Sequence, residues 1–306
     1  MILTSACVLL LLAGCSRSSI GPSQANRLPA WYGIVTQNWS PDYGPWTAEL
    51  GVGWVRLDFN WFEIEPDRNV FDWAILDSKV YAAYAQSLRI YGTLAYTPAW
   101  AGPCPHCMPD SLDDWRQFVE AVLAHYRGAG IVFGIWNEPN LGFLNDTPDG
   151  ARYAALFGQA NAARLRVDRF ATLAGPETSH HGYPAYYQSV MSQILPNMQA
   201  GDVVSVHYYP DAPFDLGTYM DSVNGSAGGR AVWLTETGLG TCDDAAQGLY
   251  FRSVLDTFYG RGRTWWPRVF FYVLFNGQYC TDAIVRPDGS RRPSFAAYQQ
   301  FIAAHR

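Results

Sequence analysis

The sequence of 306 residues predicts a single (β/α)8 barrel, the TIM-barrel form of the α/β class, from three observations. Eight short apolar segments alternate with eight helical patterns, and eight such units favour a closed parallel barrel over an open sheet. No Pro-, Gly- or Ser-rich linker divides the chain after residue 30, so residues 30–306 are expected to form one domain. Polar residues end several of the apolar segments, and the carboxyl ends of barrel strands are where such folds place their active sites.

The strand candidates are runs rich in β-branched and aromatic residues, as expected for strands that are covered on both faces. In order they are Trp31–Val35, Trp54–Asp58, Arg89–Tyr96, Ile131–Asn137, Phe170–Ala174, Val203–His207, Ala231–Glu236 and Arg268–Phe275. Apolar residues spaced three and four positions apart predict helices between these strands. The helix candidates are Thr47–Leu50, Asp72–Gln86, Ser111–Tyr126, Ala151–Val167, Pro184–Met198, Leu216–Val223, Ala245–Tyr259 and Pro293–Ala304. Ser111 is the expected N-cap of its helix, because two aspartates follow it in the first turn.

The first fifteen residues contain an apolar run that is too short to cross a bilayer and fits a signal peptide. The run ends in Leu12-Ala13-Gly14-Cys15, which resembles the signal of bacterial lipoproteins, although no Lys or Arg precedes it. This resemblance implies that Cys15 is lipidated, and Ser16 after it favours the outer membrane. Residues 16–29 lack apolar periodicity and are expected to form a flexible tether. We therefore expect a protein of the bacterial cell envelope that is anchored to the membrane by a lipid, with secretion as the alternative.

Composition and charge limit the classes of partner. The net charge is −6 without a basic stripe, so a nucleic-acid partner is not expected. Aromatic residues make up 15% of the chain, which suits stacking against sugar rings, although a large aromatic core is the alternative. The acidic residues near positions 42–44 and 146–149 do not match a calcium loop, and neither a metal nor an organic cofactor is expected. The sequence gives no indication of the oligomeric state.

Four cysteines follow the signal segment, which holds Cys15. In an exported chain this even number suggests two disulfides: Cys104 with the nearby Cys107, and Cys242 with Cys280 across neighbouring loops. Cys104-Pro-His-Cys107 also matches the redox motif of thiol oxidoreductases, but no helix begins directly behind it to lower a thiol pKa. A zinc site here would lack a fourth nearby ligand.

Two glutamates at strand ends carry the chemistry that the sequence predicts. Glu138 stands in Trp136-Asn137-Glu138-Pro139 at the end of the fourth strand, and Glu236 ends the seventh strand in Thr235-Glu236-Thr237-Gly238. Across a barrel mouth these carboxyls would face each other. Glycoside hydrolysis needs two carboxyls on either side of one bond, about 5–5.5 Å apart when the configuration is retained.

These stretches resemble clan A of the glycoside hydrolases. The resemblance implies that Glu138 is the general acid/base, Glu236 the nucleophile, and that Asn137 binds the sugar 2-hydroxyl. It also implies a β-type bond as the one cleaved. These roles imply a double-displacement mechanism, in which Glu138 is expected to hold a proton at the start and to give it to the leaving oxygen.

Further residues match the pattern of this clan. Arg56 corresponds to the strand-two arginine of the clan, a positive partner that would keep Glu236 ionised. A His-x-Tyr on strand six supports the nucleophile in many members, and His207-Tyr208-Tyr209 matches it. Because His207 and Tyr209 fall on one face of the strand, Tyr209 is the expected hydrogen-bond donor to Glu236.

Other segments extend the resemblance along the chain. Gly53–Arg56, Phe71–Trp73 and Tyr96–Ala101 are similar to glycoside hydrolase family 39 and its bacterial exopolysaccharide-hydrolase relatives. Tyr96 and Trp100 are candidate platforms for a sugar ring, with packing beneath the third loop as the alternative. Glu177 either lines the sugar site or caps the next helix. We expect a retaining hydrolase of a poly- or oligosaccharide, and the alternative is a glycan-binding surface lipoprotein without catalysis.

Overall fold

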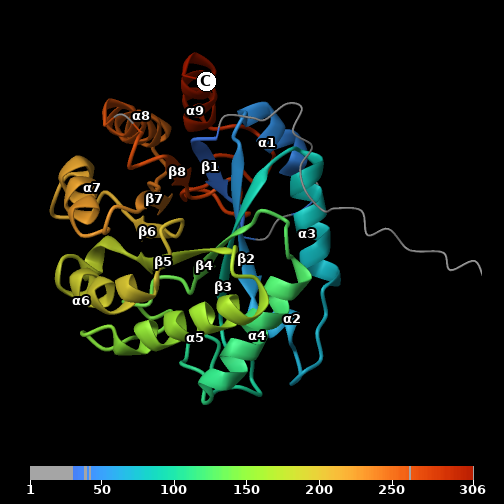
Figure 1. Ribbon diagram of the computed structural model, residues 1–306. Coiled ribbons are helices and arrows are strands. Elements are labelled where there is room, and N and C mark those ends of the chain that lie inside the picture. The colour runs from blue at the N-terminus through green and yellow to red at the C-terminus, as the bar shows by residue number, and fades with distance from the viewer. Residues whose placement is uncertain (1–29, 38–39, 41–42, 262, 306) are drawn as a thin grey trace, which may run out of the picture.

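The computed structural model describes residues 30–37, 40, 43–261 and 263–305. Eight parallel strands form a closed barrel in the order β1 to β8, with β1 paired to β8, so the predicted (β/α)8 barrel is confirmed (Figure 1). The expected signal peptide, the tether and Cys15 lie outside the described residues. Within the described part of the chain, no helix has the length and apolarity needed to cross a membrane.

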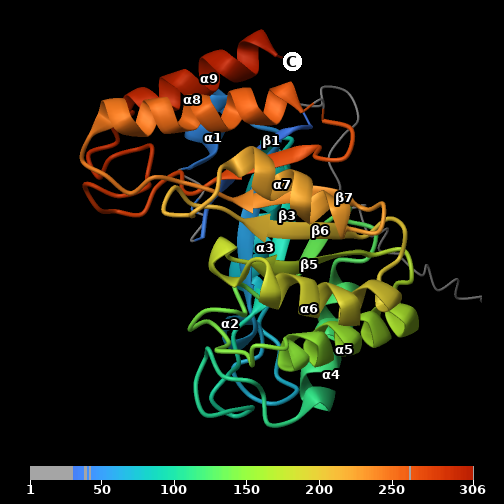
Figure 2. The same ribbon diagram turned by 90° about the vertical axis from the view of Figure 1, so that its left-hand side faces the viewer.

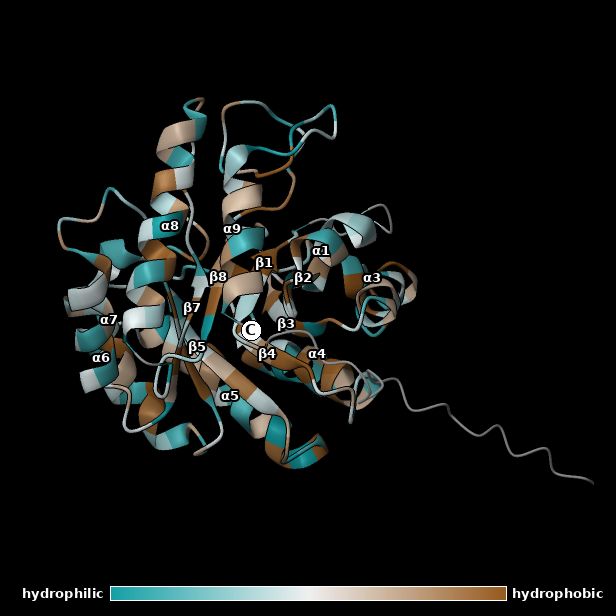
Figure 3. Cartoon of the chain, turned by 90° about the horizontal axis from the view of Figure 1, so that it is seen from above, coloured by the Kyte–Doolittle hydropathy of each residue, from teal (hydrophilic) through white to brown (hydrophobic). Residues whose placement is uncertain are grey.

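The helices surround the strands, as the views from the side and from above show (Figures 2 and 3). The strands are β1 (Tyr32–Val35), β2 (Trp54–Asn60), β3 (Arg89–Ala95), β4 (Val132–Ile135), β5 (Thr172–Thr178), β6 (Val203–His207), β7 (Ala231–Glu236) and β8 (Arg268–Phe271). The α-helices are α1 (Gly44–Leu50), α2 (Trp61–Ile64), α3 (Ala74–Ala85), α4 (Leu112–His125), α5 (Ala151–Val167), α6 (Ala185–Ile194), α7 (Leu216–Gly225), α8 (Asp244–Gly260) and α9 (Pro293–Ala304). Two 3-10 turns, η3 (His180–Gly182) and η4 (Leu195–Asn197), flank α6.

The fifth strand differs most from its prediction. It was expected at Phe170–Ala174, but β5 spans Thr172–Thr178 and runs through Gly175 and Pro176. Pro176 is accommodated by a register shift against β6 between Pro176 and Thr178. Phe170 lies before the strand and is exposed. Glu177 therefore belongs to the barrel wall instead of the loop after it.

Smaller differences concern short elements. The four-residue helix α2 and the turn η3 were not predicted, because such short pieces carry no readable periodicity. Strands β4 and β8 are four residues long each and end earlier than expected, so Asn137 and Glu138 follow β4 in the loop. Ser111 caps α4 as predicted, since its side chain accepts a hydrogen bond from the backbone N–H of Asp114.

The barrel interior is filled by bulky aromatic rings. Trp54 of β2 and Trp233 of β7 meet edge to face with ring centroids 5.1 Å apart, and Phe270 packs against both. Gly33 has no room for a side chain, because a Cβ there would lie 2.3 Å from the Phe270 ring. The interior is thus a packed core, as in other barrels of this class, and forms a rigid floor below the carboxyl ends of the strands.

Both predicted disulfides are present. Cys104 pairs with Cys107 in the loop between β3 and α4, and Cys242 after β7 pairs with Cys280 after β8. The helix α4 begins only at Leu112, so no helix N-terminus stands directly behind the Cys104–Cys107 pair. This geometry does not support the redox reading.

Candidate active site

Glu138 and Glu236 lie side by side at the carboxyl end of the barrel. One carboxylate oxygen of each glutamate and a ring nitrogen of His207 all lie within 4.8 Å of one another. The two glutamates are 7% and 8% exposed, so each keeps a small opening to solvent. This separation is close to the roughly 5–5.5 Å of retaining glycosidases and well below the roughly 6.5–9.5 Å that an inverting enzyme needs for its water.

Glu236 is held by one cation and one phenol. Nη1 of Arg56 donates to its Oε2 at 2.8 Å, the Tyr209 hydroxyl donates to its Oε1, and the Tyr208 N–H donates to its backbone carbonyl. Burial lowers the pKa of Arg56, but Glu177 and Glu236 raise it by more, so the guanidinium stays charged. Burial, and next Glu236, raise the pKa of Tyr209 well above its usual value, so it remains a donor. The predicted contacts of Arg56 and Tyr209 with Glu236 are therefore both formed.

His207 pairs chiefly with Glu138. Its Nδ1 lies 3.0 Å from Oε1 of Glu138 but 3.9 Å from Oε2 of Glu236, so it supports the expected acid/base more closely than the nucleophile. Burial lowers the pKa of His207, but Glu236, Glu138 and Glu177 together raise it to about 9. The His207 side chain is fully buried, which leaves these carboxylates as its main electrostatic neighbours.

This contact changes the protonation expected for Glu138. Burial raises the pKa of Glu138, but the hydrogen bond and positive charge of His207 lower it by more, and the net effect is a lowered pKa. In the free protein the proton of this pair therefore resides on His207. The expectation that Glu138 itself holds the proton at the start is not met, because sequence alone did not place an imidazolium against it.

Glu177 is a third, fully buried carboxylate beneath the other two. Its Oε2 lies 3.2 Å from Nη2 of Arg56 and 3.2 Å from Nε2 of His207. Its backbone carbonyl accepts the N–H of Glu138 at 3.0 Å. With 0% exposure it cannot reach a substrate, and it caps neither η3 nor α6, so neither predicted role holds. Glu177 is a positioning residue that orients both cations.

A glycine in β4 makes room for this carboxylate. A Cβ at Gly134 would lie 2.6 Å from Oε1 of Glu177 and 2.7 Å from the Tyr91 hydroxyl. Contacts this short would displace either buried group, so the third carboxylate requires glycine at this position.

Asn137 is oriented by Arg56 on β2 and by Tyr96 directly after β3. Its Oδ1 accepts a hydrogen bond of 2.7 Å from Nη2 of Arg56, and its side chain also hydrogen-bonds Tyr96. The Tyr96 ring packs near His106 and Phe143, with centroid distances of 5.0 and 6.4 Å. Asn137 and Tyr96 are both partly exposed, so each can reach a ligand above Glu138. Their binding of sugar stays a prediction.

Trp100 packs against Trp61 and Arg68. Its ring meets Trp61 edge to face at 5.7 Å, its Nε1 donates to the backbone carbonyl of Glu65, and the Arg68 guanidinium lies over the ring. These contacts favour the packing alternative over a sugar platform.

Two further carboxyls near Glu236 carry raised pKa values. Burial raises the pKa of Asp58 to about 6, against the lowering effect of Arg56. Burial also raises the pKa of Asp282 to about 6, and the charge of Glu236 adds to this effect. Asp58 ends a predicted strand and could be suspected from the sequence. Asp282 lies in a loop after β8 without any motif, so sequence reasoning missed it.

The central cluster does not suit a metal ion. Glu138, His207 and Glu236 are close enough to share one, but both ring nitrogens of His207 face carboxylate oxygens and the ring carries a proton on each. A histidine ligand must offer an unprotonated nitrogen. The Arg56 guanidinium already supplies positive charge to Glu236.

Comparisons with known proteins agree with the barrel fold. The family model described as "Glycosyl hydrolase catalytic core" matches residues 103–298. No curated protein is significantly similar to the chain.

Several solved structures share the fold. A family 39 glycoside hydrolase from Bacteroides cellulosilyticus is 18% identical over 90% of this chain, with a TM-score of 0.75. A β-xylosidase of the same family from Caulobacter crescentus is 20% identical over 94%, with a TM-score of 0.73. A family 39 enzyme from Xanthomonas axonopodis pv. citri is 18% identical over 90%, with a TM-score of 0.75. The chain spans 64%, 73% and 66% of the lengths of these three proteins, respectively.

Proposed function

Because the chain belongs to the glycosyl hydrolase catalytic core family, we propose that it hydrolyses β-glycosidic bonds of a poly- or oligosaccharide with retention of configuration. The observation that carries this proposal is the pairing of Glu138 with Glu236, whose nearest oxygens lie within 4.8 Å. Retention requires such a short separation, because the second carboxylate attacks the sugar directly.

In the first step Glu236 attacks the anomeric carbon, and the bond from that carbon to the leaving oxygen breaks. The guanidinium of Arg56 and the hydroxyl of Tyr209 each donate to one oxygen of Glu236 and so fix the direction of the carboxylate for this attack. The leaving oxygen receives the proton of the Glu138–His207 pair through Glu138. The product of this step is a glycosyl ester on Glu236.

In the second step Glu138 acts as the base. It takes a proton from a water molecule, whose oxygen attacks the anomeric carbon and releases Glu236 as a carboxylate. Two inversions at the same carbon restore the starting configuration. The proton gained by Glu138 returns to the pair with His207, which resets the site.

The test is to assign the roles of the two glutamates separately. Aryl β-xylosides form the first substrate panel, because one structural neighbour is described as a β-xylosidase, followed by other aryl β-glycosides and polysaccharides. Glu236→Gln should lose at least about a thousandfold in kcat while the fold is kept. Proton NMR of the first product should show the retained anomer. An inverted product, or near-normal turnover by Glu236→Gln, overturns the proposal.

Glu138→Ala gives the complementary result. An aryl leaving group of low pKa departs without a general acid, so this variant should still form the glycosyl enzyme from activated substrates. Added azide should then restore turnover and yield the β-glycosyl azide, because the anion replaces the water that Glu138 would activate. Azide rescue with the α-product would assign Glu138 as the nucleophile instead.

We also propose that the enzyme is an envelope lipoprotein attached through Cys15, with residues 16–29 as tether. The support is the Leu12–Cys15 sequence. Metabolic labelling with a fatty acid should mark the wild-type chain and leave Cys15→Ser unlabelled. The same variant should move from the membrane fraction to the soluble fraction, and a labelled Cys15→Ser variant would refute the anchor.

A further inference from the structure

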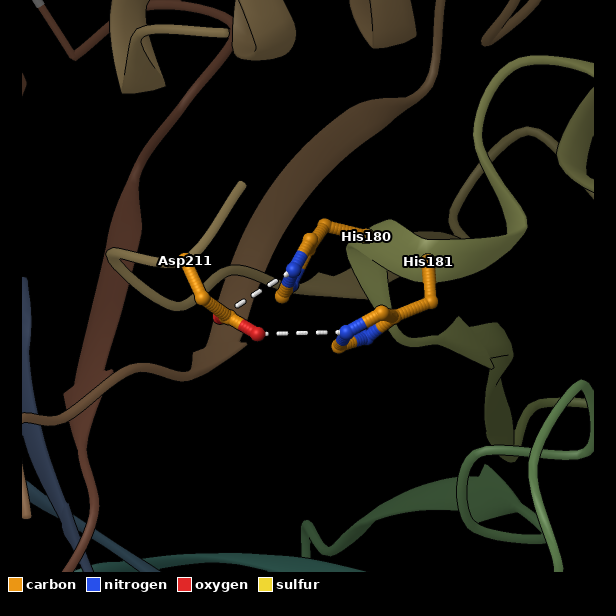
Figure 4. Close-up of side chains that lie close together, drawn as sticks. All are labelled: His180, His181 and Asp211. Carbon is orange, nitrogen blue, oxygen red and sulfur yellow. Dashed lines mark ion pairs between the residues drawn. The ribbon is translucent and has the colours of Figure 1, made fainter. Parts of the chain in front are cut away.

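A second cluster of titratable side chains lies beside the candidate active site. His180 and His181 project from the turn η3, and Asp211 reaches toward both rings from the loop after β6 (Figure 4). Nε2 of His180 lies 3.3 Å from Oδ1 of Asp211, and Nε2 of His181 lies 3.2 Å from its Oδ2. Each carboxylate oxygen thus faces one imidazole.

The tautomer of His180 is set by the backbone. The N–H of Tyr209 donates to Nδ1 of His180 at 3.3 Å, so in the neutral ring the proton sits on Nε2. His180 is 1% exposed, and its Nε2 lies 3.3 Å from Oδ1 of Asp211 without forming a well-aligned hydrogen bond with any described residue. A buried N–H whose neighbouring acceptor is poorly aligned is costly, which makes it a ready donor to a better placed oxygen.

His181 can present a second donor next to the first. Its Nδ1 lies 2.9 Å from the Ser179 hydroxyl, which can donate to it and leave the proton on Nε2. The two imidazole rings lie 4.0 Å apart. The two Nε2 atoms lie 3.3 and 3.2 Å from the two oxygens of the Asp211 carboxylate, so together they can face both oxygens of one carboxylate group.

A metal ion fits this cluster less well, although its three ligand atoms lie close together. A histidine that binds a metal through Nε2 carries its proton on Nδ1 and donates it to an acceptor. Nδ1 of His180 faces the Tyr209 N–H instead of an acceptor. If Nδ1 carried a proton, that proton and the Tyr209 N–H would point at each other. The donor set is therefore better suited to an anion than to a cation.

Hydrogen bonds of Tyr209 and Asn140 connect the cluster to Glu236 and to the loop that carries Glu138. Tyr209, whose N–H contacts His180, donates its hydroxyl to Glu236. Asn140 binds the backbone of Ser179 through both ends of its amide and so ties η3 to the loop that carries Glu138. A sugar unit next to the cleaved bond would therefore lie within reach of His181, whose side chain is 53% exposed.

We propose that His180 and His181 bind the carboxylate of an acidic sugar unit in the substrate, and that Asp211 occupies their donors while the site is free. Asp211 is 63% exposed on its loop, so its side chain can swing into solvent when a uronate arrives. The inference names a substrate class and so rests on the proposed glycosidase function.

The experiment measures binding without turnover. Glu236→Gln protein is titrated by calorimetry with a β-linked oligosaccharide that contains glucuronic acid, and with the same oligosaccharide after its carboxyls are reduced to alcohols. The acidic form should bind at least about tenfold more tightly, as expected for hydrogen bonds to a charged group. Adding His181→Phe, which keeps the ring but removes both nitrogens, should abolish this preference and leave the affinity for the reduced form unchanged.

The variant Asp211→Asn should have the opposite effect on binding. Because it removes the competing carboxylate, it should increase the affinity for the acidic oligosaccharide several-fold and leave the reduced one unaffected. His125→Phe and Asp77→Asn form a matched control, since these residues make a similar pair, with 2.9 Å between Nε2 and Oδ1, at the end of α4. Neither control should alter the preference.

Three outcomes would overturn the inference. Equal binding of the acidic and reduced oligosaccharides is one, and failure of the acidic oligosaccharide to bind Asp211→Asn protein is another. Stoichiometric binding of zinc chloride that is lost in Asp211→Asn would assign a metal site instead. The proposed glycosidase function fails separately, if the wild-type protein hydrolyses nothing in the neutral and acidic substrate panel.

Discussion

Nδ1 of His207 lies 3.0 Å from Oε1 of Glu138, and both groups are nearly closed off from solvent. Protonation of the candidate acid is therefore a property of the pair and not of the glutamate alone. His207 holds the proton with a pKa of about 9, while the same contact lowers the pKa of Glu138.

The first prediction concerns the pH dependence of activity. In the wild type the pair keeps one proton until the pH passes about 9, so the basic limb of the kcat/KM profile should lie near that value. In His207→Phe the carboxyl of Glu138 must hold the proton alone, and the limb should move to lower pH by at least about two pH units. A stopped assay with an aryl glycoside measures both profiles. An unchanged basic limb in the variant would show that His207 does not supply the proton.

The second prediction concerns stability at alkaline pH. Folding raises the pKa of His207 from 6.5 to about 9, so its contribution to stability is complete below pH 6.5 and is lost as the pH rises through 9. The free energy of unfolding should fall across this window by an amount on the order of a few kcal/mol. Asp58 and Asp282, with pKa values of about 6, have largely lost their protons below this pH window and therefore contribute little to the slope within it. Urea unfolding at several pH values measures the slope, and His207→Gln should flatten it.

The third prediction separates a buried ion pair from an exposed one. Glu177→Ala removes a fully buried carboxylate from between Arg56 and His207 and should cost about 3–5 kcal/mol of unfolding free energy. Asp256→Ala breaks the pair with Arg252 on the surface of α8, where both side chains are more than half exposed, and should cost at most about 1 kcal/mol. Urea unfolding of the two variants gives the comparison. Similar losses would mean that Glu177 does not hold the two cations in place.

The fourth prediction concerns the two disulfides. Cys242 and Cys280 are separated by 38 positions, whereas Cys104 and Cys107 are separated by 3. The longer bridge restricts the unfolded chain more, so its double serine variant should lose about 4 kcal/mol against about 2 kcal/mol for the shorter bridge. Thermal unfolding under non-reducing conditions tests the order, and a larger loss from the Cys104–Cys107 pair would contradict it.

The sequence was sufficient for the barrel and for the surroundings of Glu236. Strand alternation placed His207 and Tyr209 on one face, and the strand ends brought Arg56 to the same edge. Local period and the meeting of parallel strands placed these residues at one edge, while their roles beside Glu236 were predicted from the resemblance to clan A.

The surroundings of Glu138 were less predictable. The register shift at Pro176 turns Glu177 into the barrel wall, and no pattern in the sequence marks such a bulge. Without Glu177 in place, the position of His207 between two carboxylates could not be inferred. Asp282 was missed for a related reason, since its place near Glu236 depends on the path of an irregular loop.

The buried carboxylate that Gly134 accommodates has a consequence for ligands. Three glutamates, Glu138, Glu177 and Glu236, face two basic side chains, Arg56 and His207, so acidic groups are in excess at the centre. The sugar ring gains positive charge as its bond to the leaving oxygen breaks, so this excess of acidic groups attracts the transition state more strongly than the neutral substrate. Cationic ring mimics such as iminosugars should for the same reason be held more tightly than their uncharged oxygen counterparts.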